Sequence, residues 1–169
     1  VTGSFGNTFS YKGLKLNVFM TYSFGNKLRL DPVFKYSYSD LDAMPKEFKN
    51  RWMIPGDERY THVPVISSKR QHNKNGSLSY AYNAYNNSDV RVADGGFIRM
   101  KEISLSYDFP KKLITKIGFN SLSMKLQGTN LFLIYADDKL NGQDPEFFRS
   151  GGVAAPVPKQ FTFTLRLGL

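Results

Sequence analysis

Histidines and carboxylates are the side chains of this sequence that could hold a metal ion or move a proton. His62 and His72 stand ten residues apart in a polar stretch, whereas a zinc pair needs closer spacing or further ligands. Glu102 and Asp108 lie six residues apart in a strand-like segment, so they are about 20 Å apart, too far for a catalytic carboxylate pair. Cysteine is absent, which excludes a thiol nucleophile. The sequence therefore predicts no enzyme, no metal site and no cofactor.

The segment DDKLNGQDPE looks faintly like a calcium-binding loop, through Asp137, Asn141 and Gly142. An EF-hand needs an oxygen ligand at its third position and a glutamate at its twelfth. Those two positions hold Lys139 and Phe148 here. Because the pattern fails at both, we expect a turn-rich loop instead of a calcium site.

Aromatic side chains in the long polar stretch after Asn26 are the remaining candidates for a binding function. They could stack on sugars, clasp a peptide or contact a partner protein, or they could simply pack the stretch on itself. The candidate contacts are Trp52, Tyr60, Tyr80, Tyr82 and Tyr85. In the same stretch, AMPKEFKNRW predicts a short surface helix, because Met44, Phe48 and Trp52 recur at spacings of four.

The elements that must position these groups are β-strands, because apolar residues recur at every second position. From Glu102 to Phe109, polar and apolar residues alternate without exception. Strands are expected over residues 2–11, 14–25, 97–109, 121–134 and 159–169. Their apolar faces carry Leu16, Val18, Met20, Ile103, Leu105, Tyr107, Phe109, Leu126, Phe163, Leu165 and Leu167.

Connection lengths distinguish a membrane barrel from a soluble β-sandwich. Lys12-Gly13 is a tight turn and PKKLITKIG predicts a short helical turn, whereas residues 26–96 and 135–158 form long loops. Alternating short and long connections are typical of outer-membrane barrels. The expected strands also reach the roughly nine to eleven residues that a tilted strand needs to cross a bilayer. Soluble strands average about five or six.

Aromatic residues at both ends of the strands also favour the membrane. One group lies near the short turns and the other near the long loops, as two interfacial belts would. The first group is Tyr11, Tyr107 and Phe109, and the second is Tyr22, Phe24, Phe97, Phe132 and Phe161. We therefore predict an all-β fold: about five antiparallel strands of a larger transmembrane β-barrel, with the apolar faces in lipid.

The formal net charge of +9 raises the question of a nucleic-acid partner. The 23 lysines and arginines are scattered, and the densest group is only Lys111, Lys112 and Lys116. Dispersed charge of this kind solvates a surface, so no nucleic-acid binding is expected. The chain starts at Val1 without an initiator methionine, and we expect it to be a piece of something longer.

Several motifs in order resemble the SusC/RagA-type TonB-dependent transporters of Gram-negative outer membranes. GSFGNTFSYKGLKLNVFMTYSFGNKL resembles a barrel hairpin of that family, and KNRWMIPGDERYTHVPVI resembles one of its loops. The stretch from DGGFIRMKEISLSYDFPKKL to GQDPE resembles the family's terminal hairpin, and PVPKQFTFTLRLGL its closing strand. One departure is Leu169, which stands where many outer-membrane barrels end in an aromatic residue.

The resemblance implies a barrel of about 22 strands with an N-terminal plug, of which this chain would supply the C-terminal strands and neither the plug nor the TonB-contacting segment. It implies import of a nutrient, an oligosaccharide or peptide, powered by the TonB complex and assisted by a SusD-like surface lipoprotein. The loops would be extracellular and the C-terminus periplasmic. The alternative from the residues is a surface β-barrel that does not actively transport, such as an adhesin or a passive porin.

Overall fold

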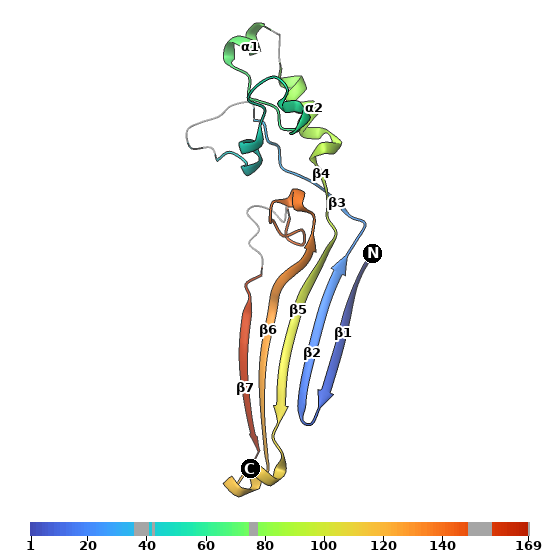
Figure 1. The fold of residues 1–169 in the computed structure, drawn as a ribbon, viewed down its shortest axis with the longest axis vertical. Coiled ribbons are helices and arrows are strands. Elements are labelled where there is room, and N and C mark those ends of the chain that lie inside the picture. Colours follow the sequence, from blue (N-terminus) through green and yellow to red (C-terminus); the bar gives the residue numbers. More distant parts are fainter. Residues whose placement is uncertain (36–40, 42, 75–77, 149–156, 169) are drawn as a thin grey trace. The chain divides into compact units, whose positions relative to one another are not determined.

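The computed structural model describes the chain except for residues 36–40, 42, 75–77, 149–156 and 169. Leu169, the expected last strand residue, therefore lies outside the described residues. The chain divides into two compact units (Figure 1). The first comprises Val1–Asn26 and Asp94–Leu169, and the second comprises Lys27–Ala93.

The first unit is a five-stranded antiparallel sheet in which neighbours along the chain are neighbours in the sheet. Its order is β1-β2-β5-β6-β7, and Figure 1 shows the long strands side by side. The strands are β1 (Thr2–Tyr11), β2 (Leu14–Ser23), β5 (Phe97–Asp108), β6 (Ser121–Ala136) and β7 (Gln160–Gly168). Their ends differ from the expected ones by no more than two residues.

The turn between β1 and β2 needs a backbone that most residues avoid. Lys12 and Gly13 both have positive φ, at 45° and 87°, as a two-residue hairpin turn with the twist of the strands requires. A Cβ on Gly13 would also lie 2.7 Å from the carbonyl oxygen of Asp108. The Asp108 amide in turn donates to the Gly13 carbonyl at 2.9 Å, which joins this turn to β5.

The connection between β5 and β6 contains the helical turn that the sequence predicted. It forms α3 (Lys111–Ile114) and the 3₁₀ turn η4 (Thr115–Ile117), and Gly118 ends it with a φ of 83°. Ile114 is 2% exposed and anchors the turn. No helix among the described residues is long and apolar enough to cross a bilayer.

The two faces of the sheet differ in chemistry because the register aligns like with like. One row across all five strands is Phe9, Leu16, Leu105, Leu126 and Phe163. The next row is Thr8, Asn17, Ser104, Gln127 and Thr162. In the apolar row all but Leu16 are exposed, Leu126 by 58%, so this face has no cover from the described residues.

β-bulges correct one element of the predicted aromatic belts. The simple alternation placed Phe97 on the apolar face with Ile103, and this was wrong. The register shifts between Met100 and Glu102 on β5, and a bulge of this kind reverses which side chains face each side. Phe97 pairs with Ser23 and is 9% exposed, on the same face as Arg99.

The second unit is not the plain loop that the sequence indicated. It contains β3 (Lys27–Arg29), η1 (Lys46–Asn50), η2 (Asp57–Arg59), α1 (Lys69–Lys74), α2 (Ser79–Asn87) and η3 (Asp89–Arg91), and it ends within β4 (Val92–Asp94). Val33, Phe34 and Val63 form a small buried core with Phe48, Tyr82 and Tyr85 packed against it.

The surface helix predicted over AMPKEFKNRW is shorter than expected. Only Lys46–Asn50 is helical, as a 3₁₀ turn, so Met44 and Trp52 lie outside it. Phe48 packs edge-on against Phe34, with ring centroids 6.2 Å apart. Because three residues make a 3₁₀ turn, the spacing of four does not place these three side chains on one helical face.

An arginine on the apolar face should cost more than one on the polar face. Leu126→Arg should lower the free energy of unfolding by about 2–4 kcal/mol if the site lies near the bilayer midplane. Gln127→Arg, the adjacent residue on the other face, is the matched control and should cost clearly less. The measurement is urea unfolding of the full-length protein in bilayers. Equal losses for the two variants would contradict the assignment of the faces.

Candidate functional site

The carboxylates that faintly suggested a calcium loop instead hold a turn. The Asp137 side chain accepts hydrogen bonds from the amides of Lys139 at 2.9 Å and Asp94 at 2.7 Å. It thereby caps η5 (Asp138–Leu140), whose Leu140 is 1% exposed. Across the described ranges no group of three or more His, Asp or Glu side chains could hold a metal ion. His62 is exposed, and the His72 side chain lies outside the described residues.

A buried ion-pair cluster joins β5 to the loop after β6. Arg99, whose side chain is 5% exposed, forms an ion pair with Asp144, and its Nε lies 2.9 Å from the Glu146 carboxylate. The rings of Phe97 and Phe147 lie 5.9 and 5.8 Å from the guanidinium. We call Arg99, Asp144 and Glu146 the loop clasp. It holds the segment Gln143-Asp144-Pro145-Glu146 on the polar face of the sheet.

The bulge explains why the loop clasp was missed from sequence. Without it, Arg99 would share the apolar side with Ile103 and Leu105. With it, Arg99 pairs with Thr21 and Leu133 on the polar side. An arginine that breaks an apolar alternation is the one signal that could have indicated a bulge.

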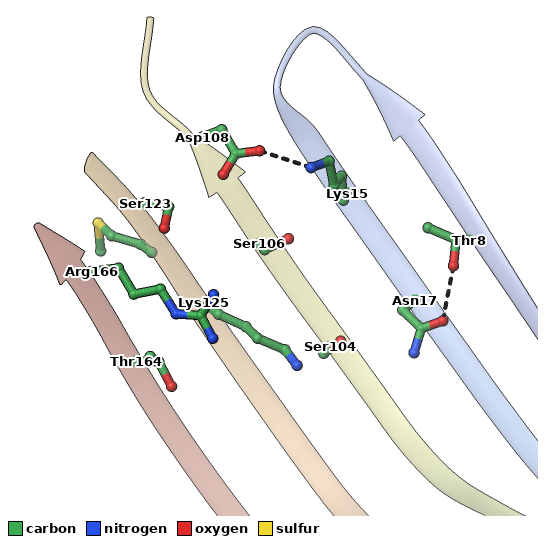
Figure 2. A pocket seen from close by; sticks show the side chains of 11 residues that line it. Thr8, Lys15, Asn17, Ser104, Ser106, Asp108, Ser123, Lys125, Thr164 and Arg166 are labelled. Atoms are coloured by element: carbon green, nitrogen blue, oxygen red, sulfur yellow. Dashed lines mark hydrogen bonds and ion pairs between the residues drawn. The ribbon is translucent and has the colours of Figure 1, made fainter. Parts of the chain in front are cut away.

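Polar side chains from all five strands surround an open hollow of about 370 Å³ near the short turns. Figure 2 shows them projecting over one stretch of the sheet. The polar lining residues are Thr8, Lys15, Asn17, Ser104, Ser106, Asp108, Ser123, Lys125, Thr164 and Arg166. We call this the polar hollow. Its charge is cationic, because three basic side chains face one carboxylate.

Specific contacts order one side of the polar hollow. Lys15 Nζ lies 2.9 Å from Asp108 Oδ2, and Thr8 Oγ1 donates to Asn17 Oδ1 at 3.0 Å; both contacts are dashed in Figure 2. The Lys15–Asp108 pair is about half exposed, so its contribution to stability is small. Ser104 is 5% exposed and lies between Asn17 on β2 and Gln127 on β6.

The candidate aromatic contacts of the second unit fall into two groups. Trp52 donates from Nε1 to the Thr61 carbonyl at 2.8 Å. Tyr82 stacks on Phe34 with centroids 4.5 Å apart, and Tyr85 meets the same ring edge-on at 5.6 Å. These three side chains therefore support the unit from inside. Tyr60 and Tyr80 are 90% and 82% exposed, which leaves them available at the surface.

Buried polar contacts hold the second unit together, and the sequence did not indicate them. Arg91 is 3% exposed, forms an ion pair with Glu47, and donates to the Asp31 carbonyl at 2.6 Å. Burial raises the pKa of Tyr85 above its ordinary value, with Glu47 adding to the rise and the nearby Arg91 charge opposing it. The Asn86 side chain accepts a hydrogen bond from the Val33 amide at 3.1 Å and donates one to the Phe34 carbonyl at 3.0 Å.

An exposed apolar tip lies at the turn before η2. The Asp57 carboxylate accepts from the amides of Met53 at 2.8 Å and Ile54 at 3.0 Å. Backbone hydrogen bonds, first from Ile54 and then from Met53, hold the pKa of Asp57 below its ordinary value. This fixed turn presents Met53 and Ile54, which are 67% and 68% exposed, and Tyr60 at the end of η2 is 90% exposed. We call these three residues the apolar tip.

Loss of the loop clasp should lower the free energy of unfolding more than loss of an exposed ion pair among the described residues. Arg99→Gln leaves the Asp144 carboxylate, 9% exposed, without its charged partner and should cost about 3–5 kcal/mol of unfolding free energy. Lys101→Gln is the matched control, since Lys101 Nζ reaches Glu146 only at 4.0 Å and is partly exposed. Hydrogen exchange at the Glu146 and Phe147 amides of the full-length protein should rise only in the first variant. Unchanged exchange in Arg99→Gln would show that the clasp does not hold this loop.

Comparisons with known proteins agree with this fold. No family model matches the chain. It is 29% identical over 158 residues to TonB-dependent receptor P39 and 24% identical over 149 residues to TonB-dependent receptor P3, both of Formosa agariphila. These matches cover 91% and 86% of the chain but only 14% and 12% of the relatives, so the chain spans a small part of their length.

Solved structures show the same fold over nearly the whole chain. The RagAB peptide importer in its open-open state covers 99% of the chain with a TM-score of 0.65 and 22% identity. The RagAB peptide transporter covers 98% with a TM-score of 0.63 and 24% identity. The chain in turn spans 17% of each of those chains. The motifs, the open antiparallel sheet and these two sets of matches agree: this chain is similar in sequence to TonB-dependent receptors, and it folds as an antiparallel transmembrane β-barrel segment like that of RagAB.

Proposed function

We propose that this chain forms part of a transporter that imports a nutrient, a peptide or an oligosaccharide, across the outer membrane with energy from the TonB complex. The observation that carries the proposal is the two-faced sheet, whose fold matches the RagAB peptide importer along 99% of the chain. The relatives named TonB-dependent receptor support the energy source. The structural neighbours are a peptide importer and a peptide transporter, which favours a peptide. The plug and the TonB-contacting segment would lie outside these residues.

The two faces of the sheet would have different roles in a transporter, one in contact with lipid and the other with water. The apolar side chains named from the sequence, from Leu16 on β2 to Leu167 on β7, would meet the acyl chains of the bilayer. The polar face, including the polar hollow, would line the lumen through which the nutrient passes. A strand with one apolar and one polar face is what a barrel wall around an aqueous lumen requires.

The direction of the strands gives an orientation for the connections. Both long connections, after β2 and after β6, leave the same end of the sheet, because the strands are antiparallel. Outer-membrane barrels have long loops outside and short turns on the periplasmic side. We therefore place Lys27–Ala93 and the connection after β6 outside the cell. The Lys12-Gly13 turn, α3 and the end of β7 would lie at the periplasmic side.

A SusD-like surface lipoprotein would be the partner of the outer loops. The support is the likeness to the RagAB structures, together with the apolar tip, which exposes three large side chains around η2. Exposed apolar groups of this kind mark protein contacts. Tyr60 and Tyr80 are the aromatic residues free to touch a partner or nutrient. Trp52, Tyr82 and Tyr85 would act by supporting the unit.

Active import can be separated from the alternative of an adhesin or passive porin. In its host, deletion of the full-length gene should abolish uptake of the peptides or oligosaccharides that the protein imports. Collapse of the proton gradient should abolish uptake in wild-type cells as well, because TonB draws on that gradient. Uptake that continues after a protonophore has collapsed the proton gradient would identify a passive porin. Unchanged uptake after deletion would favour an adhesin.

The orientation can be tested by labelling single cysteines in intact cells, since this chain has no cysteine of its own. Tyr60→Cys in the second unit and Lys112→Cys in the short connection are both at exposed positions. A membrane-impermeant maleimide should label only Tyr60→Cys, and both should react after lysis. Labelling of Lys112→Cys alone in intact cells would reverse the proposed orientation.

A further inference from the structure

The charges of the polar hollow are unevenly paired. Lys15 and Asp108 neutralise each other at 2.9 Å. Lys125 and Arg166 have no carboxylate partner among the residues that the structure describes. In Figure 2 both side chains extend over the part of the hollow between β5 and β7.

The strand register brings the two unpaired cations together. Lys125 on β6 lies opposite Thr164 on β7, and Arg166 is the next β7 residue on that face. Diagonal neighbours of this kind have their α carbons roughly 7–8 Å apart, within reach of long side chains. Like charges at this spacing repel, so a negative group between them would relieve the repulsion.

Hydroxyl groups surround the same two cations. Ser106 on β5 lies opposite Lys125, and Ser123 on β6 lies opposite Arg166. Thr164 on β7 lies opposite Lys125 on its other side. Each hydroxyl can donate one hydrogen bond to an oxyanion. The only carboxylate in the hollow, Asp108, is already held by Lys15.

We propose that Lys125 and Arg166 form a binding site for an oxyanion, the carboxylate or sulfate group of a dissolved solute in the barrel lumen. The arginine supplies a planar fork that matches two oxygens, and the lysine supplies a compact charge. The hollow of about 370 Å³ has the size of a small-molecule site. The inference rests on the proposed import function and adds a charge class: the pathway takes anionic solutes.

Direct binding to the purified full-length protein tests the site. Selenate, which has the shape and charge of sulfate and scatters X-rays anomalously, is the probe, in detergent at low ionic strength, where screening is weak. Lys125→Gln and Arg166→Gln should each weaken selenate binding about tenfold, since each removes a charge-assisted contact. Lys125→Arg, which keeps the charge, should retain most of the affinity.

Two further variants show whether the effect is local. Lys12→Gln removes an exposed lysine of the hairpin turn, outside the hollow, and should leave binding unchanged. Asp108→Asn should tighten binding several-fold, because it removes the only carboxylate and frees Lys15. Anomalous density between Lys125 and Arg166 would locate the selenate. Equal binding by Lys12→Gln, Lys125→Gln and Arg166→Gln would overturn the site.

Another outcome would also overturn the proposal. An acidic side chain of the longer protein, seen between Lys125 and Arg166 and excluding selenate, would show that the cations hold a protein segment. Uptake is measured on the same variants. Selenate binding at the site with no energy-dependent uptake would reject the import function alone. Uptake without selenate binding would reject the anion site alone.

Discussion

The alternation of side chains along each strand is the constraint on which the rest of this structure depends. Backbone hydrogen bonds join all five strands into one sheet, while successive side chains point alternately to the apolar face and to the polar face. The apolar row through Leu126 and the polar row through Gln127 are one residue apart. Because a slip of one residue would exchange the two faces, the register is fixed by both faces at once.

A bulge changes which residues of a strand face each side of the sheet, so β5 can place apolar side chains on the outer face in one part and a charged side chain on the polar face in another. Near the short turns β5 gives its apolar side chains to the outer face, as at Leu105. Beyond the shift between Met100 and Glu102, residues with the parity of Leu105, such as Arg99, turn inward instead. Arg99 is thereby aimed at Asp144 and Glu146 instead of at lipid, where an unpaired charge would be costly. The bulge thus makes the buried ion pairs compatible with a membrane strand.

Much of the sheet could be predicted from sequence, because alternation is a local signal that needs no knowledge of neighbours. Leu105, Leu126 and Phe163 were placed on one face by parity, and the register puts them in one row. Phe97 was placed wrongly because a bulge changes parity without changing composition. The partners of Arg99 could not be predicted from sequence either, since Asp144 lies 45 residues away.

The structure of the second unit was harder to predict from the sequence, for a different reason. Its core rests on few apolar residues, and its helical elements are at most nine residues long, too short for a clear 3.6-residue period. Long-range polar contacts, such as Arg91 with Glu47 and Asn86 with Phe34, join parts of this unit that are far apart in the sequence. Such contacts have no sequence pattern. The candidate aromatics could be recognised as a group, but which of them are exposed depends on this packing.

The edges of the sheet connect the stability of this segment to its surroundings. β1 and β7 have no partner strand on their outer sides among the described residues. In hydrocarbon each unpaired backbone N–H or C=O costs several kcal/mol, so the apolar face can enter a bilayer only when further strands pair with both edges. The same physics keeps charge off that face. Lys15, Lys125 and Arg166 therefore lie on the polar side, and any selectivity for charge that this segment contributes must be exerted from the lumen.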